Sequence, residues 1–340
     1  MNHHHRISVA MCTYNGSQFL PEQLASIVRQ IRLPDEMVIC DDGSKDTTSE
    51  IVERFSRDAP FPVRFIRNPE NLGSTKNFEK AIGLCTGDLI ALSDQDDIWM
   101  PQKLAIQSEM MESDMELGGV FSDAELINDR SQPIGRRLWS APRFTARKQG
   151  RFRSGDAISV LLERNVAWGA TMMIRSNVRH LFSDIPKPWI HDAWITWMLV
   201  LYSKMEFTPE PLIEYRLHIR QVTGIEELIR PRPLTLLERL LKGKREEPAK
   251  HLARARELEV LYERLMTRQD PRSQAVLPAL RQAIRFFTDC GTPYSNYLLR
   301  TSRILRNTWN YQRYEHGWKS LIRDLVLMLI PMEPERSVKP

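Results

Sequence analysis

The chain has 340 residues, 42% hydrophobic and 27% charged, a balance typical of globular rather than disordered proteins. At about 100–200 residues per domain, this length predicts two domains, or one large domain with an appendage. The net charge of +5 is compatible with phosphate-bearing ligands or an anionic surface. It is too small to indicate nucleic-acid binding, and neither zinc-finger spacing nor an RNA-binding signature is present.

The cysteines Cys12, Cys40, Cys85 and Cys290 have no CxxC spacing, so we expect buried thiols in a reducing compartment rather than structural zinc. The first residues lack the apolar stretch of a secretory signal. No apolar run approaches the ~18–20 residues of a membrane span. These features predict a cytoplasmic protein, with a peripheral position at the inner face of the cell membrane as the alternative.

Short apolar runs and helical patterns alternate over the first hundred residues. Strands are predicted at residues 7–12, 37–40, 63–66 and 89–92, and helices at 19–30, 46–55 and 73–85. This alternation predicts βαβ units and a mostly parallel sheet flanked by helices, in the α/β class. In such sheets ligands bind at the carboxyl ends of the strands, where the polar motifs of this chain fall.

The pattern changes twice further along the chain. Residues 117–216 are mixed, with strands predicted at 120–121 and 172–174, and residues 128–153 are typical of a mobile loop that orders over a ligand. The segment 230–233, Arg-Pro-Arg-Pro, interrupts the pattern, and beyond it the chain is helical. We therefore place a domain boundary near residue 230.

Three carboxylates, Asp94, Asp96 and Asp97, follow the strand predicted at 89–92. A divalent cation would relieve their repulsion, and Mg²⁺ and Mn²⁺ prefer such oxygen ligands. The alternative, a helix N-cap, accounts for Asp96 and Asp97 but not for Asp94. Asp41 and Asp42 end another predicted strand, where they either bind a base or ribose or form an Asp-Gly turn.

Four motifs in order resemble glycosyltransferase family 2, whose members adopt the GT-A fold. They occupy residues 9–16, 41–46, 71–81 and 93–99, and the resemblance covers about residues 6–225. The last motif resembles the form found in rhamnosyltransferases. The resemblance implies that Asp96 binds Mg²⁺ or Mn²⁺ at the donor diphosphate and that Asp94 lies near the ribose or sugar. The other implied nucleotide or donor contacts are Thr13, Tyr14, Asn15, Asp41, Asn71, Gly73 and Lys76.

The second half of the site is implied by three further segments. Asp192 resembles the catalytic base, although the family often has Glu where this chain has His191; the alternative is a helix cap. His218 resembles a metal ligand or diphosphate contact, although a lone His is usually structural, and Arg216 or Arg220 would neutralise phosphate. The segment 165–172 resembles the strand under the donor sugar, and Gly169 would let the sugar approach the backbone closely. The alternative for the neighbouring Trp168 is a place in the hydrophobic core.

The resemblance implies a GT-A catalytic domain over residues 1–230, with a nucleotide-sugar half at about 1–100 and an acceptor half at about 101–230. Residues 231–340 form an all-helical extension. Its last helix has apolar residues at helical spacing, including Trp318, Leu321 and Ile322. It either packs on the catalytic domain or a second subunit, or lies in the plane of a membrane surface.

We expect an inverting, metal-dependent glycosyltransferase of cell-surface polysaccharide synthesis. The donor would be a dTDP- or UDP-sugar, with rhamnose as the first choice and a UDP-hexose (Glc, Gal or GlcNAc) as the alternative, and the acceptor a saccharide or lipid-linked saccharide. A nucleotidyltransferase would need a Gly-rich basic loop near the N-terminus, which residues 13–16 lack. A non-catalytic nucleotide-sugar-binding relative would not need Asp94, Asp96 and Asp192.

Overall fold

The computed structural model describes residues 5–218, 236–292, 297–315 and 318–329. The chain divides into two compact units. The first comprises Met1–Leu161 and Asn165–Arg230, and the second comprises Leu162–Arg164 and Pro231–Pro340. The first unit contains the sheet and every segment that carries a candidate site residue.

The N-terminal half of the first unit is a parallel sheet. The strands are β1 (Ile7–Thr13), β2 (Glu36–Asp41), β3 (Val63–Arg67) and β4 (Leu89–Ser93), and the helices between them are α1 (Leu20–Val28), α2 (Thr48–Asp58) and α3 (Ser74–Leu84). β1 pairs in parallel with both β2 and β4, and β2 pairs in parallel with β3. The predicted βαβ units are confirmed, with boundaries within a few residues of those expected.

The C-terminal half makes the sheet mixed, in the order β3-β2-β1-β4-β8-β6-β9-β5. β8 (Met172–Arg175) enters antiparallel between β4 and β6 (Leu117–Ile127). β9 (Lys204–Arg216) is parallel to β6 and pairs at its end with the short β5 (Ile98–Trp99). The α/β class is confirmed, and parallel pairing holds for β1–β4 and for β6 with β9.

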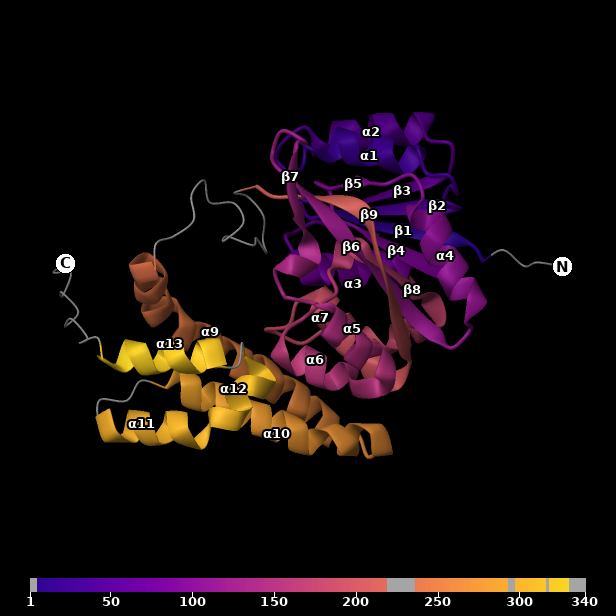
Figure 1. The fold of residues 1–340 in the computed structure, drawn as a ribbon. Helices are drawn as coiled ribbons and strands as arrows, with labels where there is room; N and C mark the ends of the chain where they lie inside the picture. The colour runs from indigo at the N-terminus through magenta and orange to yellow at the C-terminus, as the bar shows by residue number, and fades with distance from the viewer. Residues whose placement is uncertain (1–4, 219–235, 293–296, 316–317, 330–340) are drawn as a thin grey trace. The chain divides into compact units, whose positions relative to one another are not determined.

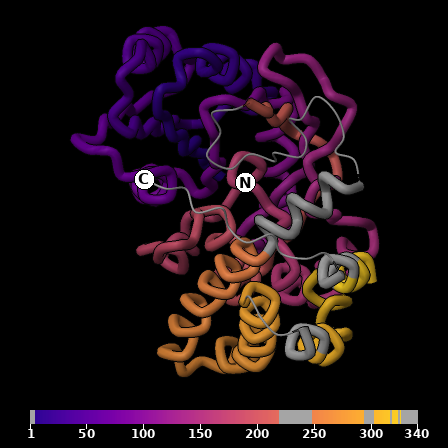
Figure 2. Tube along the Cα trace, turned by 90° about the vertical axis from the view of Figure 1, so that its left-hand side faces the viewer, coloured from indigo at the N-terminus to yellow at the C-terminus, as the bar shows by residue number. Residues whose placement is uncertain are grey.

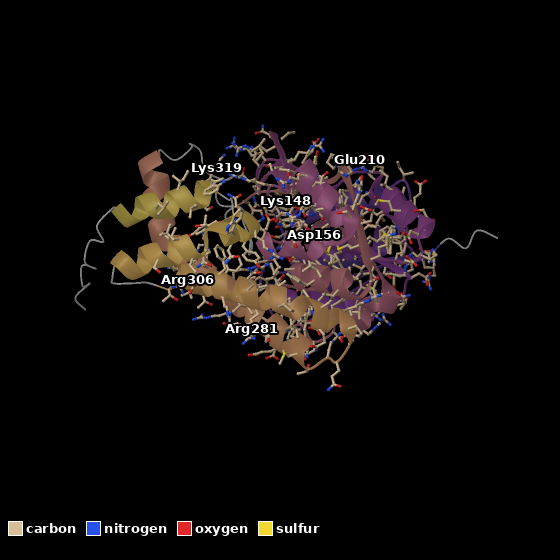
Figure 3. All side chains as sticks on the ribbon, turned by 60° about the horizontal axis from the view of Figure 1, so that its bottom comes forward. Lys148, Asp156, Glu210, Arg281, Arg306 and Lys319 are labelled. Carbon is tan, nitrogen blue, oxygen red and sulfur yellow. The ribbon has the colours of Figure 1, made fainter. Side chains whose placement is uncertain are left out.

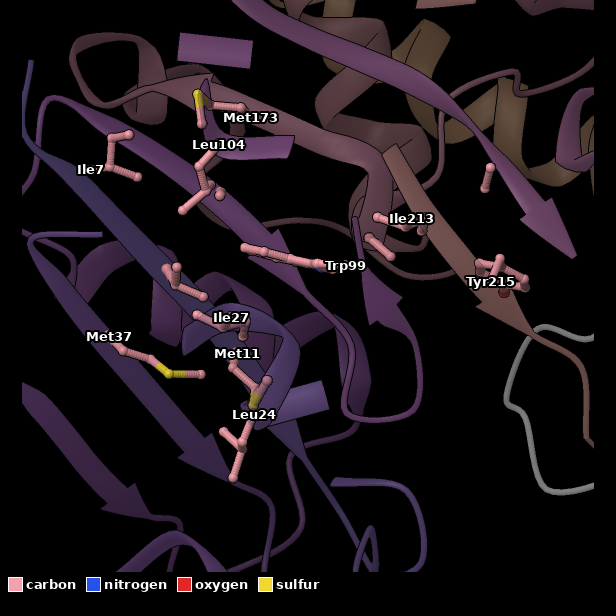
Figure 4. Close-up of a cluster of buried hydrophobic side chains, with 14 of the residues drawn as sticks. Ile7, Met11, Leu24, Ile27, Met37, Trp99, Leu104, Met173, Ile213 and Tyr215 are labelled. Atoms are coloured by element: carbon pink, nitrogen blue, oxygen red, sulfur yellow. The ribbon is translucent and has the colours of Figure 1, made fainter. Parts of the chain in front are cut away.

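Helices cover both faces of this sheet (Figure 1). α1, α2 and α4 (Lys103–Ser113) share a hydrophobic core with one face, in which Leu24 and Ile27 meet Met11 and Met37 (Figure 4). α3 and α7 (His191–Tyr202) contact each other on the other face. Each fully buried side chain of this size contributes about 1.5–3 kcal/mol. The core thus holds β1, β2 and β4 in the register that aligns their polar ends.

The segment 128–153, expected to be a mobile loop, is instead largely folded. It contains β7 (Pro133–Arg137), paired with β6, the 3₁₀ turn η1 (Leu138–Ser140) and α5 (Ala146–Arg151). It is followed by the π-helical turn η2 (Phe152–Asp156) and by α6 (Ala157–Glu163). Aromatic packing explains why the segment is folded. The ring centroids of Trp139, Phe144 and Phe152 lie 5.7, 6.0 and 5.7 Å from that of Phe121. Such a buried cluster outweighs the polar composition of the segment.

In the residues that the structure describes, the second unit is built of helices, as predicted. Its helices are α9 (Leu236–Met266), α10 (Pro271–Gly291), α11 (Tyr297–Arg306), α12 (Thr308–Tyr314) and α13 (Trp318–Leu329). α9 and α10 pack side by side (Figure 2), with Leu258 and Leu261 of α9 and Leu280 of α10 all fully buried. The amphipathic pattern of this region therefore builds a helix-packed core of its own.

The apolar stripe of α13 is divided between core and surface. Leu321 is buried, whereas Trp318 and Ile322 are 59% and 57% exposed. Basic side chains such as Arg306 and Lys319 are exposed on the same unit (Figure 3). Within the residues described, no helix combines the length and apolarity required to cross a membrane.

Candidate functional site

The carboxyl ends of β1 and β2 are tied together by hydrogen bonds between their polar residues. The parallel register sets Thr13 opposite Asp41, and the Thr13 hydroxyl donates to the Asp41 carboxylate at 2.9 Å. The next residue but one, Asn15, has a left-handed backbone (φ 48°) that turns the chain back. Its amide accepts from the Lys45 N–H at 2.8 Å, and its own N–H donates to Ser44 at 2.9 Å. The first two motifs therefore form one rigid edge.

Asp41 and Asp42 are buried, and their carboxylates organise this edge. Asp41 accepts from the Ser44 N–H at 2.9 Å and lies 3.7 Å from the Arg67 guanidinium. Asp42 accepts from the Leu72 and Gly73 N–H groups at 2.8 and 2.9 Å. The Asp-Gly turn therefore also binds the third motif, through the Asp42 carboxylate. The base or ribose contact of Asp41 stays a prediction.

The third motif lies against this edge through main-chain contacts. The Asn71 side chain donates to the Asp42 carbonyl at 3.2 Å, and Gly73 has a left-handed backbone with φ 80°. Lys76, in the first turn of α3, pairs instead with Glu79 at 2.8 Å and Asp184 at 3.3 Å. The structure brings Asn71 and Gly73 to the strand ends, whereas the Lys76 side chain pairs with the carboxylates of Glu79 and Asp184.

The carboxylate cluster follows β4 and leads into β5, not into a helix, so the helix-cap alternative is wrong. Burial, with the charges of Asp96 and Asp192, raises the pKa of Asp94 to about 8. Burial, with Asp96 and Asp94, also raises the pKa of Asp97, which is fully buried and accepts the Arg216 N–H at 3.0 Å. Carboxylates of the Asp94–Asp97 loop and α7 therefore converge on one electrostatic site.

The residues predicted as metal ligands meet. The Asp96 carboxylate lies 2.8 Å from Nε2 of His218, at the end of β9. A carboxylate oxygen and an imidazole nitrogen so placed could turn onto one cation. In the part of the chain described, no group of three or more candidate ligands occurs. The remaining ligands would be diphosphate oxygens and water, the usual arrangement for hard cations at phosphates. The side chains present thus fit a cation held jointly with a donor.

Arg216 is fully buried and supports the carboxylate loop. Its guanidinium donates to the Asp96 carbonyl at 2.7 Å and to Ser131 at 2.8 Å, and it pairs with Glu22 of α1 at 2.6 Å. It also lies over the Phe19 ring at 4.6 Å. A phosphate contact would require these partners to be exchanged, so that role stays a prediction. Arg220 lies outside the described residues.

Asp192, the predicted base, is the second residue of α7 and is 7% exposed. It does not cap its helix from the N-cap position, which Ile190 occupies. Its carboxylate instead accepts from the Gly169 N–H at 3.3 Å and from the Ala193 N–H. Burial raises its pKa to about 6, and these N–H donors oppose the shift.

Gly169 begins the 3₁₀ turn η3 (Gly169–Thr171), and a Cβ there would stand 2.6 Å from Nε2 of His191. The glycine therefore makes room for His191, and the sugar approach stays a prediction. Its neighbour Trp168 packs against the hydrophobic core, as the core alternative proposed.

Gln95, inside the carboxylate motif, was not among the candidate residues. It exchanges two hydrogen bonds with the main chain of Tyr14, at 2.8 and 3.0 Å. A Cβ at Gly16 would come within 2.1 Å of the Gln95 side chain, so this contact needs the glycine. The pairing joins the first motif to the fourth, and only the presence of a polar residue between the carboxylates hints at it in the sequence.

Two sequence relatives illustrate the similarities of this chain. An uncharacterized glycosyltransferase from Nostoc is 27% identical over 220 residues, covering 63% of this chain and 65% of that protein. A dTDP-rhamnosyl transferase, RfbG, from Shigella flexneri is 38% identical over 98 residues, covering 28% of this chain and 34% of that protein. The chain thus matches less than two thirds of the length of either.

Solved structures share the fold. TarS residues 1–349 from S. aureus, in complex with UDP-GlcNAc, has a TM-score of 0.52 at 17% identity, covering 95% of this chain and 90% of that one. The mannosyltransferase PcManGT from Pyrobaculum calidifontis, in complex with GDP-Man and Mn²⁺, has a TM-score of 0.50 at 18% identity, covering 98% and 89%. At these identities the likeness shows the GT-A fold alone.

A family model matches the part of the chain that carries the four motifs, while Asp192, Arg216 and His218 lie beyond the match. Described as "Glycosyl transferase family 2", it covers residues 8–177, half of the chain, including the first four motifs and Gly169. The chain therefore belongs to glycosyltransferase family 2.

Proposed function

We propose that the protein transfers a sugar, with inversion, from a nucleotide-diphosphate donor to a hydroxyl of an acceptor. One observation carries this most directly: the carboxylate of the base candidate Asp192 is buried and held by the Gly169 N–H, and its charge contributes to the raised pKa of Asp94, two residues before the Asp96 that lies 2.8 Å from His218. A base and a diphosphate-binding site on either side of one sugar are what such a displacement requires.

In this mechanism Asp192 accepts the proton of the attacking hydroxyl. Its pKa of about 6 leaves it mostly ionised at neutral pH, yet more basic than an exposed carboxylate. The Gly169 and Ala193 N–H groups orient it. Asp96 and His218 would hold Mg²⁺ or Mn²⁺, which stabilises the charge that develops on the leaving diphosphate. The Arg216 guanidinium holds the Asp96 loop in place through its hydrogen bond to the Asp96 carbonyl.

For the donor we propose dTDP-rhamnose first, supported by the motif at residues 93–99 and by the similarity to RfbG. A UDP-hexose is the alternative, supported by the TarS likeness only at the level of fold. A non-catalytic nucleotide-sugar-binding protein is disfavoured because Asp94, Asp96 and Asp192 are all present and converge.

For the acceptor we propose a saccharide or lipid-linked saccharide of cell-surface polysaccharide synthesis. The protein would act in the cytoplasm, with peripheral contact at the inner face of the membrane. The exposed Trp318 and Ile322 of α13 support such contact, since aromatic and aliphatic side chains beside basic ones favour an anionic interface. Homo-oligomerisation through the second unit is the alternative use of this surface.

A thermal-shift screen tests the donor site. The ligands are dTDP, UDP, dTDP-rhamnose, UDP-glucose, UDP-galactose and UDP-GlcNAc, each with Mn²⁺ or with EDTA. A ligand at a hundred times its Kd stabilises the native state by about 2.7 kcal/mol. We expect an Mn²⁺-dependent shift that Asp96→Ala abolishes and Asp129→Ala, an exposed control, retains.

Asp192→Asn separates an enzyme from a binding protein in the same screen. We expect it to keep the donor-induced shift and to lose turnover, because the base acts on the acceptor and not on the nucleotide. No shift with any nucleotide, from folded protein, would refute the proposed function.

A further inference from the structure

His191 is a buried histidine that the mechanism above does not use. It is the first residue of α7, directly before Asp192, and is 8% exposed. One face of its ring stacks on Phe78 of α3, with centroids 4.0 Å apart and planes at 17°. The imidazole is thus clamped between α3 and the Gly169 turn.

The buried nitrogen of this ring is not used within the protein. Among the residues described, Nε2 of His191 has no hydrogen-bond partner. Burial lowers the pKa of the ring to about 3, so it is neutral at physiological pH. A buried polar atom without a partner costs about 1–3 kcal/mol, whereas an apolar side chain could fill this place without that cost. A hydroxyl bound beside this nitrogen would give it a hydrogen-bond partner.

The position of Nε2 indicates what that ligand is. The Gly169 residue against which Nε2 lies also donates its N–H to the Asp192 carboxylate. The imidazole nitrogen and the carboxylate oxygen therefore flank the same backbone unit. A neutral imidazole can donate or accept a hydrogen bond according to its tautomer, and it brings no positive charge to the base. A sugar hydroxyl, which also donates and accepts, matches both groups.

We propose that Nε2 of His191 binds a saccharide hydroxyl next to Asp192 and thereby helps to determine which sugar is used. The inference rests on the proposed function. Because Nε2 is buried and lies against Gly169, binding of the hydroxyl would require the Gly169 turn or the ring to shift. The hydroxyl belongs either to the donor sugar or to the acceptor, and kinetics distinguish the two.

Three substitutions test the nitrogen rather than the packing. A glutamine places its terminal amide near the position of Nε2, an asparagine reaches only that of Nδ1, and a leucine keeps the bulk without any polar atom. We therefore expect His191→Gln to retain most activity, while His191→Asn and His191→Leu lose about tenfold in kcat/KM, the value of one hydrogen bond. His180→Leu, at an exposed histidine, is the control.

The measurements are donor hydrolysis without acceptor, transfer to a panel of methyl hexopyranosides, and the Kd of dTDP and UDP. A loss in hydrolysis assigns the hydroxyl to the donor sugar, and a loss in transfer alone assigns it to the acceptor. Nucleoside diphosphate affinity and the Tm should not fall in either case, since neither involves the nitrogen.

Equal kinetics for wild type, His191→Asn and His191→Leu would overturn the inference. So would a loss that glutamine does not rescue, or one that weakens nucleoside diphosphate binding equally, because both would mark a packing role. If the wild type turns over no nucleotide-sugar of the screen, the proposed function fails and the inference falls with it.

Discussion

Asp192→Asn should stabilise the protein above pH 6 while it removes the base. Burial raises the pKa of Asp192 from its ordinary 3.8 to about 6, a difference of about two units. At about 1.4 kcal/mol per unit, ionised Asp192 costs the folded state about 3 kcal/mol. The asparagine accepts the Gly169 and Ala193 N–H groups less strongly than a carboxylate, so we expect a net gain of about 1–3 kcal/mol.

The sign of the pH dependence follows from the raised pKa. Below pH 3.8 the carboxyl is protonated in both states and costs nothing; the cost grows between pH 3.8 and about 6 and is complete above that. Thermal unfolding in EDTA at pH 8 and pH 4 measures it. The variant should melt several degrees above wild type at pH 8 and level with it at pH 4, at about 2–4 °C per kcal/mol.

The same variant should lose about 10²–10⁴-fold in kcat, and wild-type kcat/KM should fall tenfold per pH unit below about pH 6. Asp129→Asn, at an exposed carboxylate, should change neither property. An Asp192→Asn protein whose stability follows pH as wild type does would refute the burial argument. One that keeps wild-type turnover would refute the assignment of the base.

Three further substitutions test how the site is held. Gly169→Ala should lower the free energy of unfolding by about 1–3 kcal/mol and remove most activity, because its Cβ would collide with His191. Gly83→Ala in α3, where the glycine has open space around it, should instead raise the free energy of unfolding by about 0.5–1 kcal/mol. Denaturant unfolding curves of the two variants compare these effects. Arg216→Met should lower stability by about 2–4 kcal/mol and weaken the Mn²⁺-dependent donor shift, because the Asp96 loop loses its support; an unchanged shift would contradict this. Gln95→Ala should raise the donor KM several-fold with little change in Tm, and an unchanged KM would show that its link to the first motif is dispensable.

Local pattern was enough to predict the N-terminal half of the fold. Each of β1, β2 and β4 is a short apolar run that ends in polar residues, and amphipathic helices lie between them. The sequence did not predict the direction of the strands in the second half of the sheet. The four residues of β8 are all buried, and their pattern is the same for a parallel and an antiparallel strand. The sequence also failed to predict that the segment after β6 is folded, because its aromatic partner Phe207 lies on a strand far along the chain.

The site shows the same limit. That Asp96 and His218, 122 residues apart, form one pair was predictable only through the family resemblance. Arg216 was expected to contact a phosphate, but it pairs with Glu22, which is 194 residues away in the chain. Nothing in the sequence around Arg216 indicates that its guanidinium is fully buried. Gly169 was expected to admit a sugar, whereas it admits His191, whose position depends on the packing of α7 against α3.

The charges of the site explain why a cation and a donor would act together here. Asp97 has compensation within the protein. The Arg216 N–H donates to it, and burial lowers the pKa of Lys103 to about 7 although the charge of Asp97 raises it. For Asp94 every contribution raises its pKa, and among the residues described no ion pair with a cationic side chain is found for it. A cation bound at Asp96 together with the donor would supply the positive charge that Asp94 lacks. If the cation is shared with a diphosphate, this charge would be present only when the donor is bound, and occupancy of the nucleotide site would be coupled to the ionisation of the carboxylates beside the sugar.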